Sequence, residues 1–345
     1  MNSPPFTITS EIVRLVSEIS ETLGRFSITH PSALTPMLRH GNRLRSIQAS
    51  LAIENNTLNL EQVTAIINGK RVLGHPREIQ EVKNAFAVYE MLENLNPFSE
   101  KDLLKAHNKL MFALVDEAGQ YRSGGVGVIK GKIVVHVAPP AARVQTLMHD
   151  LLMWLKGTDV HPLIASSAFH YEFEFIHPFA DGNGRMGRLW QTLILSRWKP
   201  TLAYLPVETV IRNRQDDYYR ALGASDKQAD ATTFILFMLN AILKVLSETA
   251  TDQVNDQDSD QVAKLLSLFD KKALAASEMM QKIGLLHRPT FRNNYLHPAM
   301  DQGFIEMTVP DKPNSRLQKY RITPKGIAYI KKHKQPKTLL KLVST

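Results

Sequence analysis

Residues 177–188 read His177-Pro-Phe-Ala-Asp-Gly-Asn-Gly-Arg-Met-Gly-Arg188 and join two helical patterns. The first pattern, 161–176, ends there because Pro178 has no N–H and disfavours a helical residue before it. The second is expected over 185–197. A glycine-rich turn that enters a helix directs several backbone N–H groups at one point, where the helix dipole adds positive potential. We therefore expect this loop to bind an anion, and phosphate suits it best.

Polar side chains in the same loop supply the parts of a reaction centre. Asp181 is a carboxylate, and Mg²⁺ that bridges phosphate oxygens needs only one or two of these. His177 has a reference pKa near neutrality, which suits a general base. Asn183 can bind a phosphate oxygen or hold the loop, and Arg185 and Arg188 share one helix face and can reach the same anion. The set predicts phosphoryl or nucleotidyl transfer rather than a plain turn with surface arginines.

The composition limits the chemistry that the chain can perform. Its 345 residues contain no cysteine, which excludes disulfides, thiolate nucleophiles and cysteine-based metal sites. Residues 1–14 mix proline, threonine, glutamate and arginine, so we expect no secretion signal. Charges interrupt the longest apolar stretches, so we expect no membrane span and a cytoplasmic protein.

The pattern along the chain is mainly helical, with one β-rich region. Helical spacing covers 11–23, 33–54, 60–68, 76–95, 99–114, 142–157, 207–223 and 229–248. Two β-rich runs, 126–129 and 133–137, flank Lys130-Gly131-Lys132 and predict a hairpin.

The C-terminal part differs in charge from the rest. Residues 258–345 carry 16 Lys and Arg against 7 Asp and Glu, a net charge of +9 that equals that of the whole chain. The polar segment 251–260, in which Asp-Gln recurs, is expected to be a linker. Three short helical patterns and then two strands follow it, which is the order of a winged helix. A basic winged helix suits DNA. The reading helix would carry Arg288, Thr290, Arg292, Asn293 and Asn294. As alternatives, such a domain can bind protein, and a Lys-rich tail can serve only to keep the chain in solution.

Residues 177–188 resemble the signature of the Fic family, His-x-Phe-x-(Asp/Glu)-Gly-Asn-Gly-Arg-x-x-Arg, and match it at every fixed position. The resemblance implies an all-helical Fic core in which His177 deprotonates a Ser, Thr or Tyr hydroxyl of a protein. The hydroxyl oxygen then attacks the α-phosphate of ATP, and pyrophosphate leaves. Relatives with Lys in place of the acidic residue transfer phosphate instead, so Asp181 favours transfer of AMP.

The resemblance also implies a role for each loop residue. Asp181 would hold Mg²⁺, and Asn183 with the Gly182 and Gly184 amides would line the anion hole. Arg185 and Arg188 would hold the outer phosphates, while Phe179 would anchor the loop in the core.

Ser50-Leu-Ala-Ile-Glu-Asn55 resembles the inhibitory pattern of the same family, (Ser/Thr)-x-x-x-Glu-(Gly/Asn). Taken alone, this spacing is as typical of a solvated helix face. Beside the complete motif it implies that Glu54, supported by Ser50, forms a bidentate ion pair with Arg188 and takes the place of the ATP γ-phosphate. ATP would then bind with its α-phosphate misaligned for attack.

Two further features resemble the family. The hairpin at 122–137 is similar to the flap that aligns a target segment by strand addition, although it could simply cover the core. Tyr219 matches a position that lines the adenine site, although Tyr218-Tyr219 could also be a core pair.

Together these features predict a mainly α protein: an N-terminal helical region (1–110) with an inhibitory helix near 50–55, a Fic catalytic core (111–250), a linker (251–260), a winged-helix domain (261–335) and a basic tail (336–345). The favoured function is an autoinhibited bacterial protein adenylyltransferase that uses ATP and Mg²⁺ and modifies a target protein or itself. Removal of AMP from a modified protein, and DNA-binding regulation through 261–335 with self-directed chemistry, remain alternatives. The sequence leaves the target, the modified residue type and a homodimer open.

Overall fold

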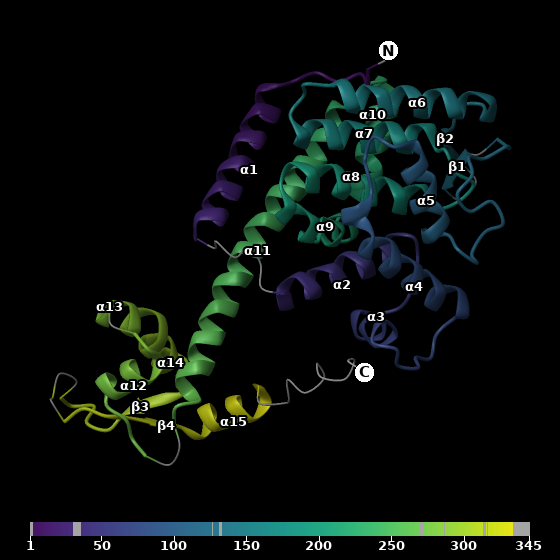
Figure 1. Ribbon diagram of the computed structural model, residues 1–345. Helices are drawn as coiled ribbons and strands as arrows, with labels where there is room; N and C mark the ends of the chain where they lie inside the picture. The colour runs from purple at the N-terminus through teal and green to yellow at the C-terminus, as the bar shows by residue number, and fades with distance from the viewer. Residues whose placement is uncertain are drawn as a thin grey trace. The chain divides into compact units, whose positions relative to one another are not determined.

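The computed structural model describes residues 3–29, 36–125, 127–130, 133–269, 272–285, 287–312, 315 and 317–333. The described chain is mainly helical, as the sequence predicts. It divides into two compact units, Met1–Ala250 and Thr251–Thr345, which are described separately (Figure 1). The predicted basic tail, 336–345, lies outside the described residues, and the other predicted domain boundaries remain predictions.

The N-terminal unit is built from helices and one hairpin. Its elements are α1 (Ser10–Thr29), α2 (Pro36–Ile53), α3 (Leu60–Ile67), α4 (Pro76–Glu90), η1 (Leu92–Asn94), α5 (Glu100–Leu110), β1 (Gly127–Lys130), β2 (Ile133–Val137), α6 (Ala141–Gly157), α7 (Pro162–Ile176), α8 (Asn183–Trp198), η2 (Pro200–Tyr204), α9 (Val207–Asn213), α10 (Gln215–Gln228) and α11 (Thr232–Leu266), which continues past the end of the unit.

Local capping explains where several of these helices begin. Asn59 and Gln62 form a reciprocal capping box at the start of α3. His75 accepts a hydrogen bond from the second residue of α4, and Pro76 occupies the first position of that helix. The same arrangement, with His161 before Pro162, starts α7.

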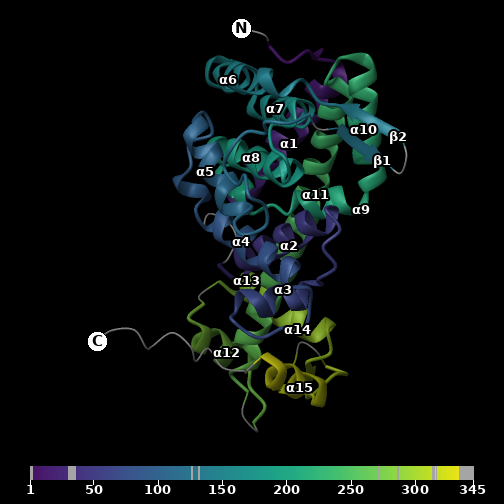
Figure 2. The same ribbon diagram turned by 90° about the vertical axis from the view of Figure 1, so that its right-hand side faces the viewer.

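Helices α7 and α8 pack along each other at the centre of the unit (Figures 1 and 2). Phe169 and Phe173 of α7 and Trp190 of α8 are fully buried in the main hydrophobic core. Burial of each large aromatic side chain contributes roughly 2 kcal/mol. The loop 177–182 between these helices is therefore held at both ends by well-packed elements.

The predicted β-rich region is a hairpin in the structure. β1 pairs antiparallel with β2, and the register shifts between Val128 and Ile129. Gly131 and Lys132 of the predicted turn lie outside the described residues.

Two helix predictions were wrong in their boundaries. The helix expected over 207–223 is interrupted at Arg214, whose φ of −125° and ψ of 38° separate α9 from α10. The segment 251–260 was expected to interrupt the helical pattern, but α11 runs through it without a break. No Gly or Pro occurs between Thr232 and Leu266, so the backbone can remain helical despite the polar composition.

By length and composition alone, part of α11 could span a membrane. The window Thr232–Thr249 has a mean hydropathy of 1.3, and half of it is buried inside the structure. Phe234, Ile235 and Ile242 of this window belong to the main core, which accounts for its apolar character.

The C-terminal unit has its own hydrophobic core and takes in the end of α11. The core includes Val262, Met279, Phe291 and Phe304. The elements after α11 are α12 (Ala276–Ile283), α13 (Arg288–Phe291), a π-helical turn η3 (Arg292–Leu296), α14 (His297–Asp301), β3 (Ile305–Met307), β4 (Tyr320–Ile322) and α15 (Pro324–His333). β3 pairs antiparallel with β4, and Leu274 forms a bridge to Tyr320.

Candidate active site

The loop between α7 and α8 changes direction at two positions with positive φ. His177 ends α7 in a left-handed conformation, with φ of 51°. Gly182 precedes α8 with φ of 85°, and a Cβ there would overlap Met111. Glycine satisfies both requirements at position 182, because it has no Cβ and tolerates positive φ. The backbone N–H groups from Asn183 onward begin α8, and anion binding at this helix start remains a prediction.

His177 presents one ring nitrogen for chemistry. Its Nδ1 lies 3.3 Å from the main-chain oxygen of Glu174. A carbonyl oxygen only accepts, so this contact favours a proton on Nδ1 and a lone pair on Nε2. The geometry therefore leaves Nε2 available as a general base.

Arg122 ties the loop to the base of the hairpin. Its side chain is 3% exposed and donates to the main-chain oxygens of Ile176, His177, Gly124 and Pro139. Burial lowers the pKa of Arg122. The contacts link the residues before and after β1 and β2 to His177.

Phe179 anchors the loop in the core, as the resemblance implied. Its ring is fully buried and stacks on His107, with ring centroids 3.6 Å apart. His107 Nδ1 accepts from the N–H of Gly119, so Nε2 carries the proton and donates to the main-chain oxygen of Asp181 at 3.0 Å. Burial lowers the pKa of His107 to about 4, which keeps it neutral in this role.

Asn183 holds the loop closed. Its side-chain oxygen accepts from the N–H of Phe179 at 2.9 Å, and its side-chain nitrogen donates to the main-chain oxygen of Phe179 at 2.8 Å. Of the two roles considered for this side chain, the structure shows the loop-holding one. A contact of Asn183 with a phosphate remains a prediction.

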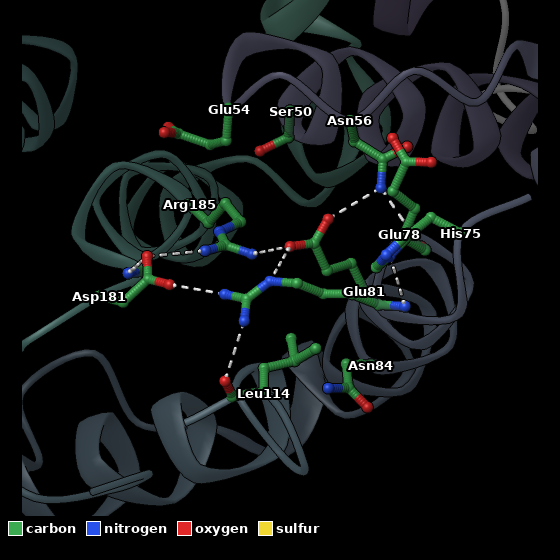
Figure 3. Close-up of polar contacts among 12 residues, drawn as sticks. Ser50, Glu54, Asn56, His75, Glu78, Glu81, Asn84, Leu114, Asp181 and Arg185 are labelled. Atoms are coloured by element: carbon green, nitrogen blue, oxygen red, sulfur yellow. Dashed lines mark hydrogen bonds and ion pairs between the residues drawn. The ribbon is translucent and has the colours of Figure 1, made fainter. Parts of the chain in front are cut away.

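Asp181 and Arg185 form a four-charge cluster with Glu81 and Arg77 of α4. Asp181 accepts from Arg185 at 3.0 Å and from Arg77 at 3.1 Å. Glu81 lies 3.3 Å from Arg185 and 3.7 Å from Arg77. Figure 3 shows Glu81 and Asp181 on opposite sides of the Arg185 guanidinium. The sequence did not predict Arg77 or Glu81 as site residues. Both look like ordinary charged residues of a helix, because only the fold shows that α4 lies beside the loop.

Arg188 is occupied by the end of α2. Its Nη2 lies 2.8 Å from Glu54 Oε1 and 3.0 Å from the main-chain oxygen of Ser50, and its Nε donates to Ser50 Oγ at 3.1 Å. The expected bidentate pair with Glu54 is thus a single ion-pair contact, while Ser50 accepts from Nε and Nη2 of the same guanidinium. Burial opposes the charge of Arg188, but the Glu54 carboxylate raises its pKa.

Gly184 explains how Glu54 comes so close to α8. A Cβ at Gly184 would overlap the Glu54 carboxylate and lie 3.0 Å from Arg188 Nη1. Only glycine therefore leaves room for both the carboxylate and the guanidinium at this turn.

Helix α2 is held in place by buried polar contacts. Glu208 of α9 is 2% exposed and accepts from Ser46 of α2 and from Tyr89 of α4, each at 3.0 Å. Gln215 donates to the main-chain oxygen of Ile53 at the end of α2. These bonds fix the part of the helix that presents Glu54.

The two tyrosines near the site have different environments. Tyr218 is 1% exposed and its hydroxyl lies 3.2 Å from His170, so it is a core residue. Tyr219 is 41% exposed. Burial and the charge of Glu54 raise the pKa of Tyr219. Its contact with adenine remains a prediction.

The residues present suit Mg²⁺ only in company with a nucleotide. Among the residues that the structure describes, no group of three or more His, Cys, Asp or Glu side chains could hold a metal ion. Asp181 is a single carboxylate whose side chain is 40% exposed. Phosphate oxygens and water would have to supply the remaining ligands, as is common for Mg²⁺ in phosphoryl-transfer sites.

Comparisons with known proteins point to one family. Residues 97–195 match the Fic/DOC family, and residues 260–323 match the C-terminal domain of Fic-like "filamentation induced by cAMP" proteins. The chain is 31% identical over 227 residues to a protein named protein adenylyltransferase Fic from Nematostella vectensis, covering 62% of this chain and 50% of that protein. It is 32% identical over 212 residues to protein adenylyltransferase fic-1 of Caenorhabditis briggsae, covering 58% and 39%. The chain thus spans half or less of the length of these curated relatives.

Solved structures extend the match to nearly the whole chain. A crystal structure of a Fic family protein from Desulfovibrio desulfuricans G20 is 62% identical, with a TM-score of 0.73, and the match covers 94% of this chain and 99% of that one. Fic-1 of Caenorhabditis elegans shares the fold at 21% identity, with a TM-score of 0.58 over 70% of this chain and 73% of that one. The motif at 177–188, the mainly helical fold around it and these matches all indicate the same family, and the chain belongs to the Fic family.

Proposed function

We propose that this chain transfers AMP from ATP to a hydroxyl of a protein side chain and that Glu54 holds the activity low at rest. The observation that carries the proposal is the position of Arg188: a buried cation of the loop whose guanidinium is already occupied by Glu54 and Ser50. The names of the adenylyltransferase relatives support the reaction class.

In the proposed reaction each side chain of the motif has one role. The lone pair of His177 Nε2 takes the proton of the target hydroxyl, and the oxygen forms a bond to the α-phosphorus of ATP. The bond to the β-phosphate oxygen breaks, and pyrophosphate leaves. The N–H groups at the start of α8, with Asn183 in support, face the phosphates, and Arg185 and Arg188 hold the outer ones. Mg²⁺, held by Asp181, would neutralise phosphate charge.

Inhibition follows from competition for one guanidinium. Arg188 cannot bind Glu54 and a γ-phosphate in the same geometry, so ATP binds at rest without its outer phosphate in place. Misplacing the α-phosphate by about 1 Å can cost about a hundredfold in rate.

The test is transfer of label from ATP carrying a labelled α-phosphate. Glu54→Gly should increase self-labelling strongly over the parent chain, and His177→Ala in that background should lose about 10²–10⁴ of the rate. Mass spectrometry of Glu54→Gly with Mg-ATP should show an added AMP and identify the modified residue. Equal labelling of the parent chain and Glu54→Gly would remove the inhibitory role from this proposal.

The reverse reaction is a second use of the same side chains. Glu54, beside Arg188 at the phosphate end of the site, would orient a water that removes AMP from a modified protein. Incubation with a purified AMPylated protein separates the two: release of AMP that requires Glu54 would favour removal, whereas labelling that increases without Glu54 favours transfer.

We also propose that the C-terminal unit binds DNA. Its support is the charge of residues 258–345 and the exposure of Arg288 and Arg292 at the predicted reading helix; the side chains of Thr290, Asn293 and Asn294 lie outside the described ones. Gel-shift affinity should then fall steeply with salt, and no binding of the full chain at low salt would contradict it. The winged-helix assignment, a homodimer and a cytoplasmic bacterial setting remain predictions.

A further inference from the structure

Arg77 lies in the first turn of α4, and its side chain contacts both Glu81 of its own helix and Asp181 of the loop between α7 and α8. Its Nη2 is 3.1 Å from Asp181, a residue 104 positions away in the sequence, and its Nη1 donates to the main-chain oxygen of Leu114 at 3.2 Å. Its backbone N–H is bound by His75, which caps the helix. Arg77 is thus placed by three segments of the fold.

The two carboxylate oxygens of Asp181 are taken by two different arginines. Arg185 binds Oδ1 and Arg77 binds Oδ2. The side chain of Arg185 is 6% exposed, whereas that of Arg77 is 48% exposed. When Asp181 turns to another ligand, Arg77 is therefore the partner with room to move.

Glu81 keeps the two arginines side by side. It lies within ion-pair distance of both, and its side chain is only 12% exposed. Asn56, two residues after Glu54, donates to Glu81 Oε2 at 2.8 Å and to the main-chain oxygen of Glu78 (Figure 3). The turn that follows α2 and carries Glu54 thus contacts the carboxylate that pairs with both cations.

We propose that Arg77 is a third phosphate-binding arginine of this site, which pairs with Asp181 in the empty site and with the outer phosphates of the nucleotide in the filled one. The inference rests on the proposed binding of a nucleotide at the loop. Arg77 and Arg185 contact the same carboxylates, so both lie at the end of the site where the outer phosphates are expected. Arginine suits this exchange because its planar guanidinium binds carboxylate and phosphate in the same geometry.

Charge balance supports the assignment. At rest the three arginines Arg77, Arg185 and Arg188 face three carboxylates, Asp181, Glu81 and Glu54. When Glu54 withdraws, the charge around Arg188 becomes more positive by one unit, which favours an anionic nucleotide. Removal of Arg77 would cancel this gain of positive charge.

The test is the affinity of Glu54→Gly/His177→Ala, which lacks the proposed base and so does not consume ATP, with and without Arg77→Gln, for ATP, ADP and AMP, measured by titration calorimetry in Mg²⁺. We expect Arg77→Gln to weaken ATP and ADP about tenfold or more, as for loss of one charge-assisted contact, and to change AMP by less than twofold. Arg77→Lys keeps the positive charge but loses the planar guanidinium, so its affinities for ATP and ADP should lie between those of the chain with Arg77 and those of Arg77→Gln. Arg14→Gln is the matched control, because Arg14 is also a partly exposed arginine between two carboxylates, Glu11 and Glu18, but lies on α1.

Two outcomes would overturn the proposal. Unchanged affinity for ATP and ADP would leave Arg77 as a partner of Asp181 only. An equal loss of affinity for all three nucleotides would mean that Arg77 only maintains the conformation of the loop. Thermal unfolding of each variant checks that the fold is kept. Because the titrations need no transfer, a chain that binds nucleotides in this manner but labels nothing would contradict the proposed reaction and leave the role of Arg77 standing.

Discussion

Arg122 shows how a buried charge can position a reactive side chain without touching the reaction. Its guanidinium donates to the main-chain oxygens of Ile176 and His177 and to main-chain oxygens at both ends of the hairpin. Carbonyl groups satisfy its N–H donors, and a buried cation without such acceptors would cost several kcal/mol. The fork geometry of arginine, rather than its charge alone, lets one side chain bridge so many groups.

We therefore predict that Arg122→Lys lowers both stability and self-labelling. An ammonium group has at most three donors and cannot span the same acceptors, so orphaned carbonyls should cost about 2–3 kcal/mol of the free energy of unfolding. In the Glu54→Gly background, labelling should fall about tenfold or more because His177 loses its fixed backbone, while nucleotide affinity changes little. Urea unfolding and α-phosphate labelling measure the two effects. Unchanged labelling in a destabilised variant would limit Arg122 to a structural role.

At the residue scale, the sequence predicts the side chains of the motif better than their neighbours. His177, Asp181 and Arg188 stand in a dense pattern whose chemistry can be read from residue types. Arg122 follows a Gly-Gln-Tyr stretch that looks like surface loop, and Arg77 looks like one charge of an exposed helix. Their roles depend on contacts with segments far along the chain, which no local pattern encodes.

At the scale of elements, α7 takes part in two regions of the molecule. It ends at His177, and its residues Tyr171 and Glu172 line a cavity of about 330 Å³ with the N-terminal segment, α6 and α10. Glu172 faces Asp226, and Asp150 lines the same cavity. Tyr171 donates to Asp226 at 3.0 Å. Burial and the Asp226 charge raise the pKa of Glu172 to about 7.

We predict that the protonation of Glu172 makes the free energy of unfolding decrease as the pH rises through the acidic range. The unfolded chain releases the Glu172 proton near pH 4.5, whereas the folded chain keeps it until about pH 7. The folded state therefore binds more protons in this window, and stability falls from pH 4.5 to pH 7 by up to about 3 kcal/mol. Glu172→Gln should remove that slope and be more stable than the parent at pH 8. Urea unfolding across this range tests it, with the exposed Glu61→Gln as control; parallel curves for Glu172→Gln and parent would contradict it.

Element boundaries were predictable where the backbone itself signals them. Pro162, Pro76 and the Asn59 cap mark starts that the sequence places correctly within a few residues. The break at Arg214 has no glycine or proline, and in the structure the Arg214 side chain pairs with Asp217 in the first turn of α10. The continuity of α11 was not predicted because the polar composition of 251–260 suggested a linker. A polar composition alone does not end a helix.

For the whole molecule, the separation of the two cores determines what nucleotide binding can stabilise. Every residue assigned to the site belongs to the unit Met1–Ala250, and the second core has a separate set of residues. All three tryptophans, Trp154, Trp190 and Trp198, also lie in the first unit. Tryptophan fluorescence therefore reports unfolding of that unit, while far-UV circular dichroism reports both.

We predict that ATP with Mg²⁺ raises the fluorescence-detected unfolding temperature of Glu54→Gly and leaves the other unit's transition in place. At a hundredfold excess over Kd the stabilisation is about 2.7 kcal/mol, which corresponds to about 5–10 °C for a unit of this size. Arg188→Ala in the same background should lose most of the shift, because the outer phosphates lose a buried cation. Coincident transitions by both signals, moving together with ATP, would mean that the two units unfold as one and would contradict their independence.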